Sequence, residues 1–76
     1  MSMNLTLKLP SGETRNIAVD ENISAAELKE MCCREAFTSP AFTKVTCDGK
    51  ALFGEKLAEE FGVHDGSTLE VIVKGL

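Results

Sequence analysis

The chain has 76 residues, so it can hold one domain with one small hydrophobic core. Its hydrophobic content of 43% with 26% charged residues is typical of a folded globular domain, and its net charge of −4 argues against a general affinity for nucleic acid. No apolar run approaches the roughly 20 residues of a membrane helix, and the first residues lack a signal-peptide pattern. We therefore expect a cytosolic or nuclear protein with no membrane partner.

The first two predicted elements form a β-hairpin. Residues 5–9 alternate between apolar and polar, which places Leu5, Leu7 and Leu9 on one face of a half-buried strand. A turn over residues 10–13 leads to a second strand over residues 14–19. Arg15 falls on the apolar face of that strand, so we expect its aliphatic stem to pack while its guanidinium reaches water.

A helix is predicted to begin after Ser24. The segment Ser24-Ala25-Ala26-Glu27 is a capping box, in which the serine hydroxyl accepts from a backbone amide and Glu27 reaches back. Apolar residues follow at helical spacing, and Pro40 prevents the helix from continuing. The predicted buried stripe contains Ala25, Leu28, Cys32 and Ala36, with Met31 at its edge.

The second half of the chain predicts two strands joined through a short return strand and a helical turn. Residues 43–47 alternate, with Val45 inward and Lys44 and Thr46 outward, and a turn at Asp48-Gly49 leads to a short strand at residues 51–52. Residues 56–61 can form a turn of helix that Gly62 ends. Residues 68–74 form the last strand, whose inward residues are Leu69, Val71 and Val73. The order predicts one α+β unit, with one helix across one face of a mixed sheet.

The three cysteines predict neither a disulfide nor a metal site. Their number is odd, Cys32 and Cys33 are adjacent on the helix, and no Cys-x-x-Cys pair occurs. Cys32 is expected to pack as a small apolar residue, and Cys33 to be a partly exposed thiol. Cys47 and His64 are the only conceivable nucleophile and base, and no third residue orients them. We expect no enzymatic activity and no cofactor.

Short matches in constant register show a resemblance to ubiquitin-like domains over residues 3–76. The matching residues are Lys8, Gly12, Lys29, Pro40, Asp48-Gly49-Lys50, Leu52, Phe61-Gly62-Val63 and Gly66-Ser67-Thr68-Leu69. The resemblance implies a single domain over residues 1–76 with the ubiquitin-like β-grasp fold. This fold is a mixed sheet of four to five strands with one helix packed across it.

The same resemblance locates a partner-binding surface on the open face of the sheet. The positions of the family's apolar patch hold Pro10, Thr46, Glu70 and Ile72, of which only Ile72 keeps the apolar character. A ubiquitin receptor would lose most of its buried contact on such a surface. We expect binding of that kind to be weak or absent.

Strand parity independently gathers basic residues on the same outward face. Lys8, Lys44 and Lys74 lie there, with Lys50 and the neighbouring Gly49 at its edge. One interpretation is an ordinary solvated face. The other is a docking face for an acidic partner segment, anchored on Ile72.

Two phenylalanines in the loop after the helix offer a second candidate surface. Phe37 and Phe42 either are exposed binding anchors or pack under the loop against Val73 and fill core volume. Phe42 is the better candidate for exposure. Phe61 is expected in the core.

These observations favour a noncovalent docking or adaptor module, carried as the N-terminal domain of a longer protein and monomeric in isolation. Its partner would be a ubiquitin-pathway receptor, a proteasome subunit or an assembly partner. A structural, assembly or chaperone-linked scaffold with its own interface is the first alternative. The second is a covalent modifier cut before a Gly-Gly tail, because the sequence ends at Gly75-Leu76.

Overall fold

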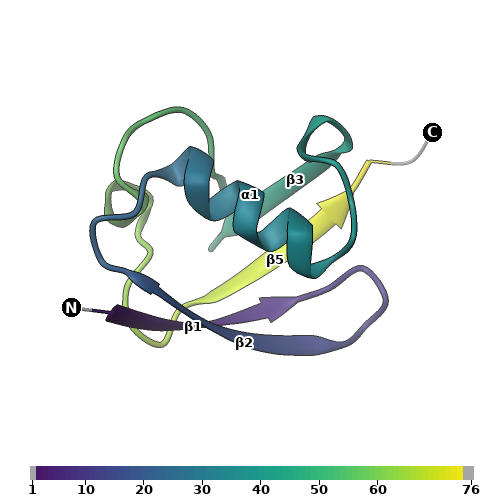
Figure 1. The fold of residues 1–76 in the computed structure, drawn as a ribbon, viewed down its shortest axis with the longest axis horizontal. Helices are drawn as coiled ribbons and strands as arrows, with labels where there is room; N and C mark the ends of the chain where they lie inside the picture. Colours follow the sequence, from purple (N-terminus) through teal and green to yellow (C-terminus); the bar gives the residue numbers. More distant parts are fainter. Residues whose placement is uncertain (1, 75–76) are drawn as a thin grey trace.

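The computed structural model describes residues 2–74 and contains a five-stranded mixed sheet with one helix across one face (Figure 1). The strands stand in the order β2-β1-β5-β3-β4, and β1 and β5 are parallel while the other pairs are antiparallel. The elements are β1 (Ser2–Lys8), β2 (Thr14–Asp20), α1 (Ala25–Glu35), η1 (Pro40–Phe42), β3 (Thr43–Cys47), β4 (Lys50–Ala51), η2 (Ala58–Phe61) and β5 (Thr68–Val73). The predicted fold class and element order are confirmed.

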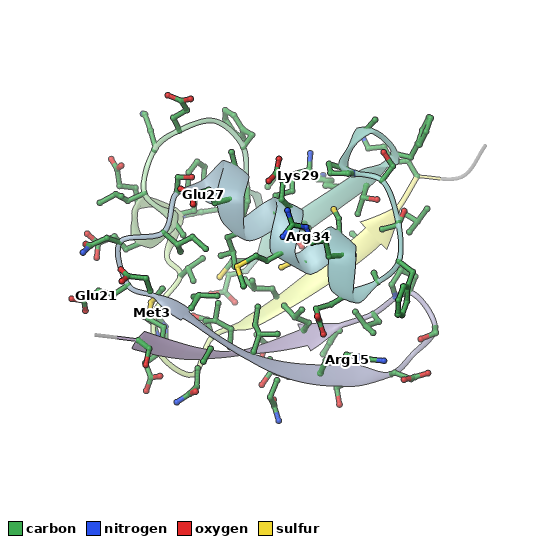
Figure 2. All side chains as sticks on the ribbon, viewed as in Figure 1. Met3, Arg15, Glu21, Glu27, Lys29 and Arg34 are labelled. Atoms are coloured by element: carbon green, nitrogen blue, oxygen red, sulfur yellow. The ribbon has the colours of Figure 1, made fainter. Side chains whose placement is uncertain are left out.

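The first hairpin has the predicted alternation. Leu5 and Leu7 are buried under α1, and the N–H of Leu9 donates to the carbonyl of Glu13 at 2.8 Å to close the turn. Arg15 stands opposite Leu7 in the register, and its guanidinium reaches Glu35 at the end of α1 at 3.7 Å. The inconsistency at Arg15 is therefore resolved by an exposed ion pair over the edge of the core; Figure 2 labels this side chain on β2.

Helix α1 begins with the cap that the sequence predicts, with one difference. The Glu27 N–H donates to the Ser24 hydroxyl oxygen at 3.2 Å, which satisfies one of the free amides of the first turn. The Glu27 carboxylate accepts from the Ser24 hydroxyl at 3.1 Å, whereas a full capping box would take the Ser24 backbone N–H.

We predict that Ser24→Ala lowers the free energy of unfolding by about 1 kcal/mol, because the amide of Glu27 loses its acceptor. Urea unfolding followed by circular dichroism measures the change. Ser11→Ala is the matched control, since its hydroxyl makes a long 3.4 Å contact with the Glu13 N–H in an exposed turn. Equal losses in the two variants would contradict the prediction.

The core lies between α1 and the sheet, and all three cysteines belong to it. Cys32 is fully buried, as predicted, and burial raises the pKa of its thiol to about 12. The expectation of a partly exposed Cys33 is wrong, because the residue is only 1% exposed and its thiol contacts Thr43 at the start of β3. Burial raises the pKa of the Cys33 thiol, although a hydrogen bond with Thr43 lowers it in part. The Thr43 hydroxyl in turn donates to the carbonyl of Ser39 at 2.7 Å and so ties the segment after α1 to β3.

Turns in the second half of the chain follow the predicted glycines. Asp48 and Gly49 both adopt positive φ, at 51° and 83°, which suits the tight two-residue connection between β3 and β4. The predicted helical turn is the shorter η2, and Gly62 ends it with a φ of 87°. Phe61 is half-buried against the core, and its ring meets that of Phe53 edge-on, with centroids 5.5 Å apart.

Within residues 2–74, no helix combines the length and the apolar character needed to cross a membrane.

Candidate docking surface

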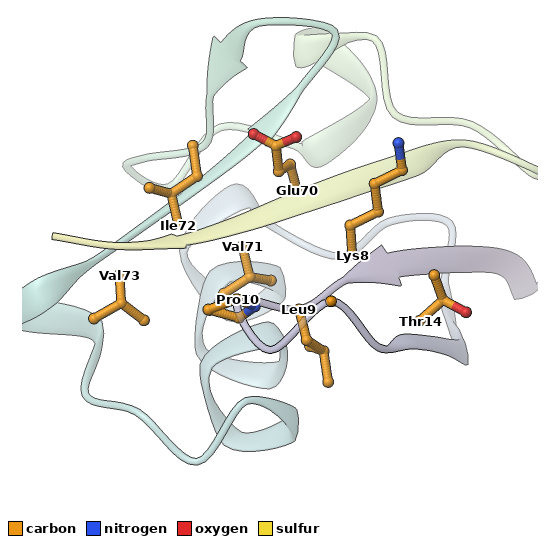
Figure 3. Close-up of a pocket in the computed structure, with 9 residues that line it drawn as sticks. Lys8, Leu9, Pro10, Thr14, Glu70, Val71, Ile72 and Val73 are labelled. Atoms are coloured by element: carbon orange, nitrogen blue, oxygen red, sulfur yellow. The ribbon is translucent and has the colours of Figure 1, made fainter.

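The face of the sheet opposite α1 is open and carries most of the predicted site residues. Figure 3 shows Lys8, Glu70 and Ile72 projecting to the same side of the sheet, while Leu9 points to the opposite side. We call the surface formed by Lys8, Lys44, Glu70 and Ile72 the outer face. All four side chains are exposed.

The strand register brings the outer-face residues together from three strands. Lys8 on β1 stands opposite Glu70 on β5, and Ile72 on β5 stands opposite Lys44 on β3. Neighbouring side chains on one face lie about 5 Å apart, so these four make one continuous surface. Ile72 keeps 38% of its surface exposed and is the apolar centre of the group.

Two hollows border this surface and share Lys8 and Glu70. The larger has a volume of about 470 Å³ and lies between the β1–β2 turn and β5 (Figure 3). Its lining includes Lys8, Pro10, Gly12, Glu70, Ile72 and Val73. The smaller, of about 300 Å³, adds Thr46 and Gly49 to Lys8 and Glu70. The two hollows are thus lined by six of the ten predicted partner-binding residues, namely Lys8, Pro10, Thr46, Gly49, Glu70 and Ile72.

Thr46 is a correction, because its side chain is only 9% exposed although it points outward. It stands opposite both Ala51 on β4 and Glu70 on β5, in the middle of three strands. Longer neighbours shield a short side chain in such a position. Thr46 can therefore shape the smaller hollow but offers little contact surface.

The remaining predicted residues lie at the margins. Lys50 is exposed on the short edge strand β4, opposite Cys47. Lys74 follows β5, and its N–H donates to the carbonyl of Phe42 at 2.7 Å, which fixes that loop beside the end of the strand. The lysines do not form a purely basic face, because the Glu70 carboxylate lies beside Lys8.

The alternative in which the two loop phenylalanines fill core volume is wrong. Phe37 is 89% exposed and Phe42 is 54% exposed, so Phe37 and not Phe42 is the more accessible ring. Val73, assigned to the inner face by parity, is 41% exposed, and it lines an open hollow at the end of α1. Sequence parity alone gave no signal for this exposure.

Cys47 does not have the environment of a catalytic nucleophile. Its side chain is buried, and burial together with the nearby Asp48 raises the pKa of the thiol, which a hydrogen bond with Ser67 and the charge of Lys50 lower only in part. A thiol with a raised pKa is a poor nucleophile at neutral pH. Among residues 2–74, no group of three or more His, Cys, Asp or Glu side chains is arranged to hold a metal ion.

No family model matches the sequence, and no curated protein matches it significantly. Solved structures match it closely in shape. The ubiquitin-like domain of an Arabidopsis thaliana protein is 21% identical, with a TM-score of 0.85 over 99% of this chain and 80% of that one. The UBL domain of Plasmodium falciparum Dsk2 is 23% identical, with a TM-score of 0.85 over 96% and 99% of the two chains.

The ubiquitin of Caldiarchaeum subterraneum is 22% identical, with a TM-score of 0.85 over 100% of this chain and 98% of that one. These identities are low, but the structural agreement extends over nearly the whole chain in each case. The chain therefore has the ubiquitin-like β-grasp fold that the short sequence matches imply.

Proposed function

We propose that this domain is a noncovalent docking module that binds another protein through its outer face. The observation that carries the proposal is the hollow of about 470 Å³ between Lys8 and Ile72, on a face that α1 leaves open. An apolar centre with a charged rim is the usual anatomy of a protein interface. Most of the residues that line the hollow are apolar, which suits an apolar side chain of a partner.

The chemistry of the rim favours a partner segment with an apolar residue between charged ones. Ile72 and Pro10 supply the apolar contact, and Lys8 and Glu70 supply one charge of each sign. Lys44 beside Ile72 adds a second positive charge, which favours an acidic partner. A ubiquitin-pathway receptor or a proteasome subunit with such a segment is the partner class that we propose, and its binding is expected to be weak because only Ile72 keeps the apolar character of the family's patch.

An NMR titration tests the proposal. A purified ubiquitin-receptor domain of the proteasome is added to the isotope-labelled chain, and amide shifts are followed. We expect the shifted amides to cluster around Lys8, Glu70 and Ile72. Shifts that avoid this face would contradict the docking site, and an unchanged spectrum at millimolar receptor would contradict the proposed partner class.

We predict that Ile72→Ala weakens this binding about tenfold, because truncation at the centre of an interface removes buried apolar contact. Phe53→Ala is the matched control, since Phe53 is also exposed but packs on Phe61 away from the outer face. Isothermal titration calorimetry gives both affinities. Equal weakening in the two variants would refute a role for Ile72.

The assembly alternative depends on the second surface, and Phe42 distinguishes it. Phe42 is exposed and tied to Lys74 through its carbonyl, so it can anchor a partner beside the outer face. The scaffold would be favoured if the chain does not bind the ubiquitin receptor and if Phe42→Ala no longer binds the assembly partner. Gly75 and Leu76, on which the modifier alternative depends, lie outside the described residues. The cytosolic or nuclear location and the place of the domain in a longer protein stay predictions.

A further inference from the structure

Phe37 occupies a backbone position that normally belongs to glycine. The Thr38 N–H donates to the carbonyl of Cys33 at 2.9 Å, and the Phe37 N–H donates to the carbonyl of Arg34 at 3.1 Å. This pair of bonds is the Schellman motif that ends many helices, and its penultimate residue adopts a left-handed conformation. Phe37 does so with a φ of 55°.

The left-handed conformation is unfavourable for Phe37, and the fold gains no contact that offsets its cost. A bulky residue at positive φ is strained, and glycine would remove the strain at once. The Phe37 ring is nevertheless 89% exposed, so it buries almost nothing within the domain. A residue that breaks a local rule without stabilising the fold points to a contact outside it.

A hollow beside the ring has the size and lining to receive such a contact. It measures about 480 Å³ and lies between the β1–β2 turn and the end of α1. Leu9, Pro10, Ala36 and Val73 give it apolar walls, and Phe37 stands at its margin. A cavity of about 150 Å³ suffices for benzene, so the hollow has room for a phenyl ring.

We infer that this surface binds a second copy of the chain, with Phe37 of each copy entering the hollow of the other. A two-fold interface uses the same patch on both subunits, so the patch must carry both the projection and the recess. Phe37 and the hollow satisfy this requirement on one surface.

Under a two-fold rotation, Arg15 of each copy can face a carboxylate of the other, which allows two ion pairs and leaves one carboxylate of each copy unpaired. Arg15 and Glu35 line it with Glu13, so each copy presents one positive and two negative groups. The Arg15–Glu35 contact is 3.7 Å long, and its side chains are 43% and 39% exposed. Such a loose surface pair contributes little within one chain, so Arg15 can turn to a carboxylate of the other copy.

The dimer is weak, because the apolar area is small. A phenylalanine side chain carries about 150–250 Å² of surface, and the exposed part of Val73 adds less than that. Two copies therefore bury on the order of 600 Å² of apolar surface, which corresponds to about 1,000 Å² in total and lies below the roughly 1,200 Å² of a stable interface. We expect dissociation constants near millimolar, and a monomer at micromolar concentrations.

Sedimentation velocity and amide shifts of the 76-residue chain between 20 µM and 2 mM test the inference. The wild type is expected to sediment faster and to shift amides of residues 9–15 and 35–38 as concentration rises. Phe37→Gly is expected to stay monomeric at 2 mM while its melting temperature rises by about 4 to 8 °C, because the strain is removed. Phe37→Ala is expected to stay monomeric without that rise, since alanine keeps the unfavourable φ.

Phe42→Ala is the matched control, an exposed phenylalanine of the same loop that does not line this hollow. It is expected to dimerise like the wild type. A wild type that remains monomeric at 2 mM overturns the inference, and so does a Phe37→Gly variant that still dimerises. The receptor titration tests the outer-face proposal separately, through the amides of Lys8, Glu70 and Ile72, which do not line this hollow.

Discussion

Replacing Leu28 by alanine will lower the free energy of unfolding by about 3 kcal/mol and so remove more than half of the stability of the domain. Leu28 is completely buried on the face of α1 that meets the sheet. Removing a buried leucine side chain loses its transfer free energy and leaves a cavity, at a typical cost of about 2–5 kcal/mol. The free energy of unfolding of a domain of this size is on the order of 5 kcal/mol, so less than half of it remains in the variant.

Urea unfolding must be followed by far-ultraviolet circular dichroism, because the chain has no tryptophan or tyrosine. Met31→Ala is the matched control on the same helix, since Met31 is only half-buried at the edge of the core. We expect it to cost about 1 kcal/mol. A Leu28→Ala variant as stable as Met31→Ala would mean that the helix packs on the sheet through other residues.

The sheet and the helix could be predicted because their residues repeat with the period of their elements. Leu5, Leu7 and Leu69 alternate with polar residues, and each is buried as the alternation requires. The turns were equally clear, since the Asp48-Gly49 pair needs the positive φ that both residues adopt. Local chemistry and fold agree at these positions.

The candidate surfaces were harder to predict, because exposure depends on where other elements end. Val73 has the parity of a core residue, but it lines an open hollow at the end of α1 and stays exposed. Thr46 has the parity of a surface residue, but strands on both sides shield it. Cys33 lies beside the predicted stripe and is buried against Thr43 of β3, a contact that the helical period does not predict. Parity gives a direction for each side chain and says nothing of its neighbours.

Phe37 shows the same limit at the level of the backbone. The sequence places no glycine after α1, so the Schellman motif that ends the helix was not predictable from composition. The exposed aromatic side chain at the left-handed position of this motif can be recognised only from the φ angle and the exposure of Phe37 together. The surfaces with the strongest functional interest are therefore those where local rules and structure disagree.

Raising the pH above 9 will destabilise the domain through its buried thiols. Cys32 has a pKa of about 12 in the folded state against an ordinary value of 9.0, and its first cause is burial, followed by the charges of Cys33 and Glu35. Between these two values the folded state binds more protons than the unfolded state, so stability falls as pH rises. The stability that the protonated Cys32 thiol contributes is fully present below pH 9. Cys32 alone accounts for a loss on the order of 1 kcal/mol at pH 10 and of a few kcal/mol at pH 11.

Urea midpoints measured from pH 7 to pH 11 give this dependence, and Cys32→Ala isolates the contribution of one thiol. The variant loses the proton linkage of Cys32, so its stability should fall less steeply above pH 9 than that of the wild type. Part of the fall remains, because burial also raises the pKa of the Cys33 and Cys47 thiols. Parallel curves for the two proteins would show that Cys32 ionises equally easily in both states. The thiol would then be open to solvent, and the packing of α1 on the sheet at this position would be looser than its burial indicates.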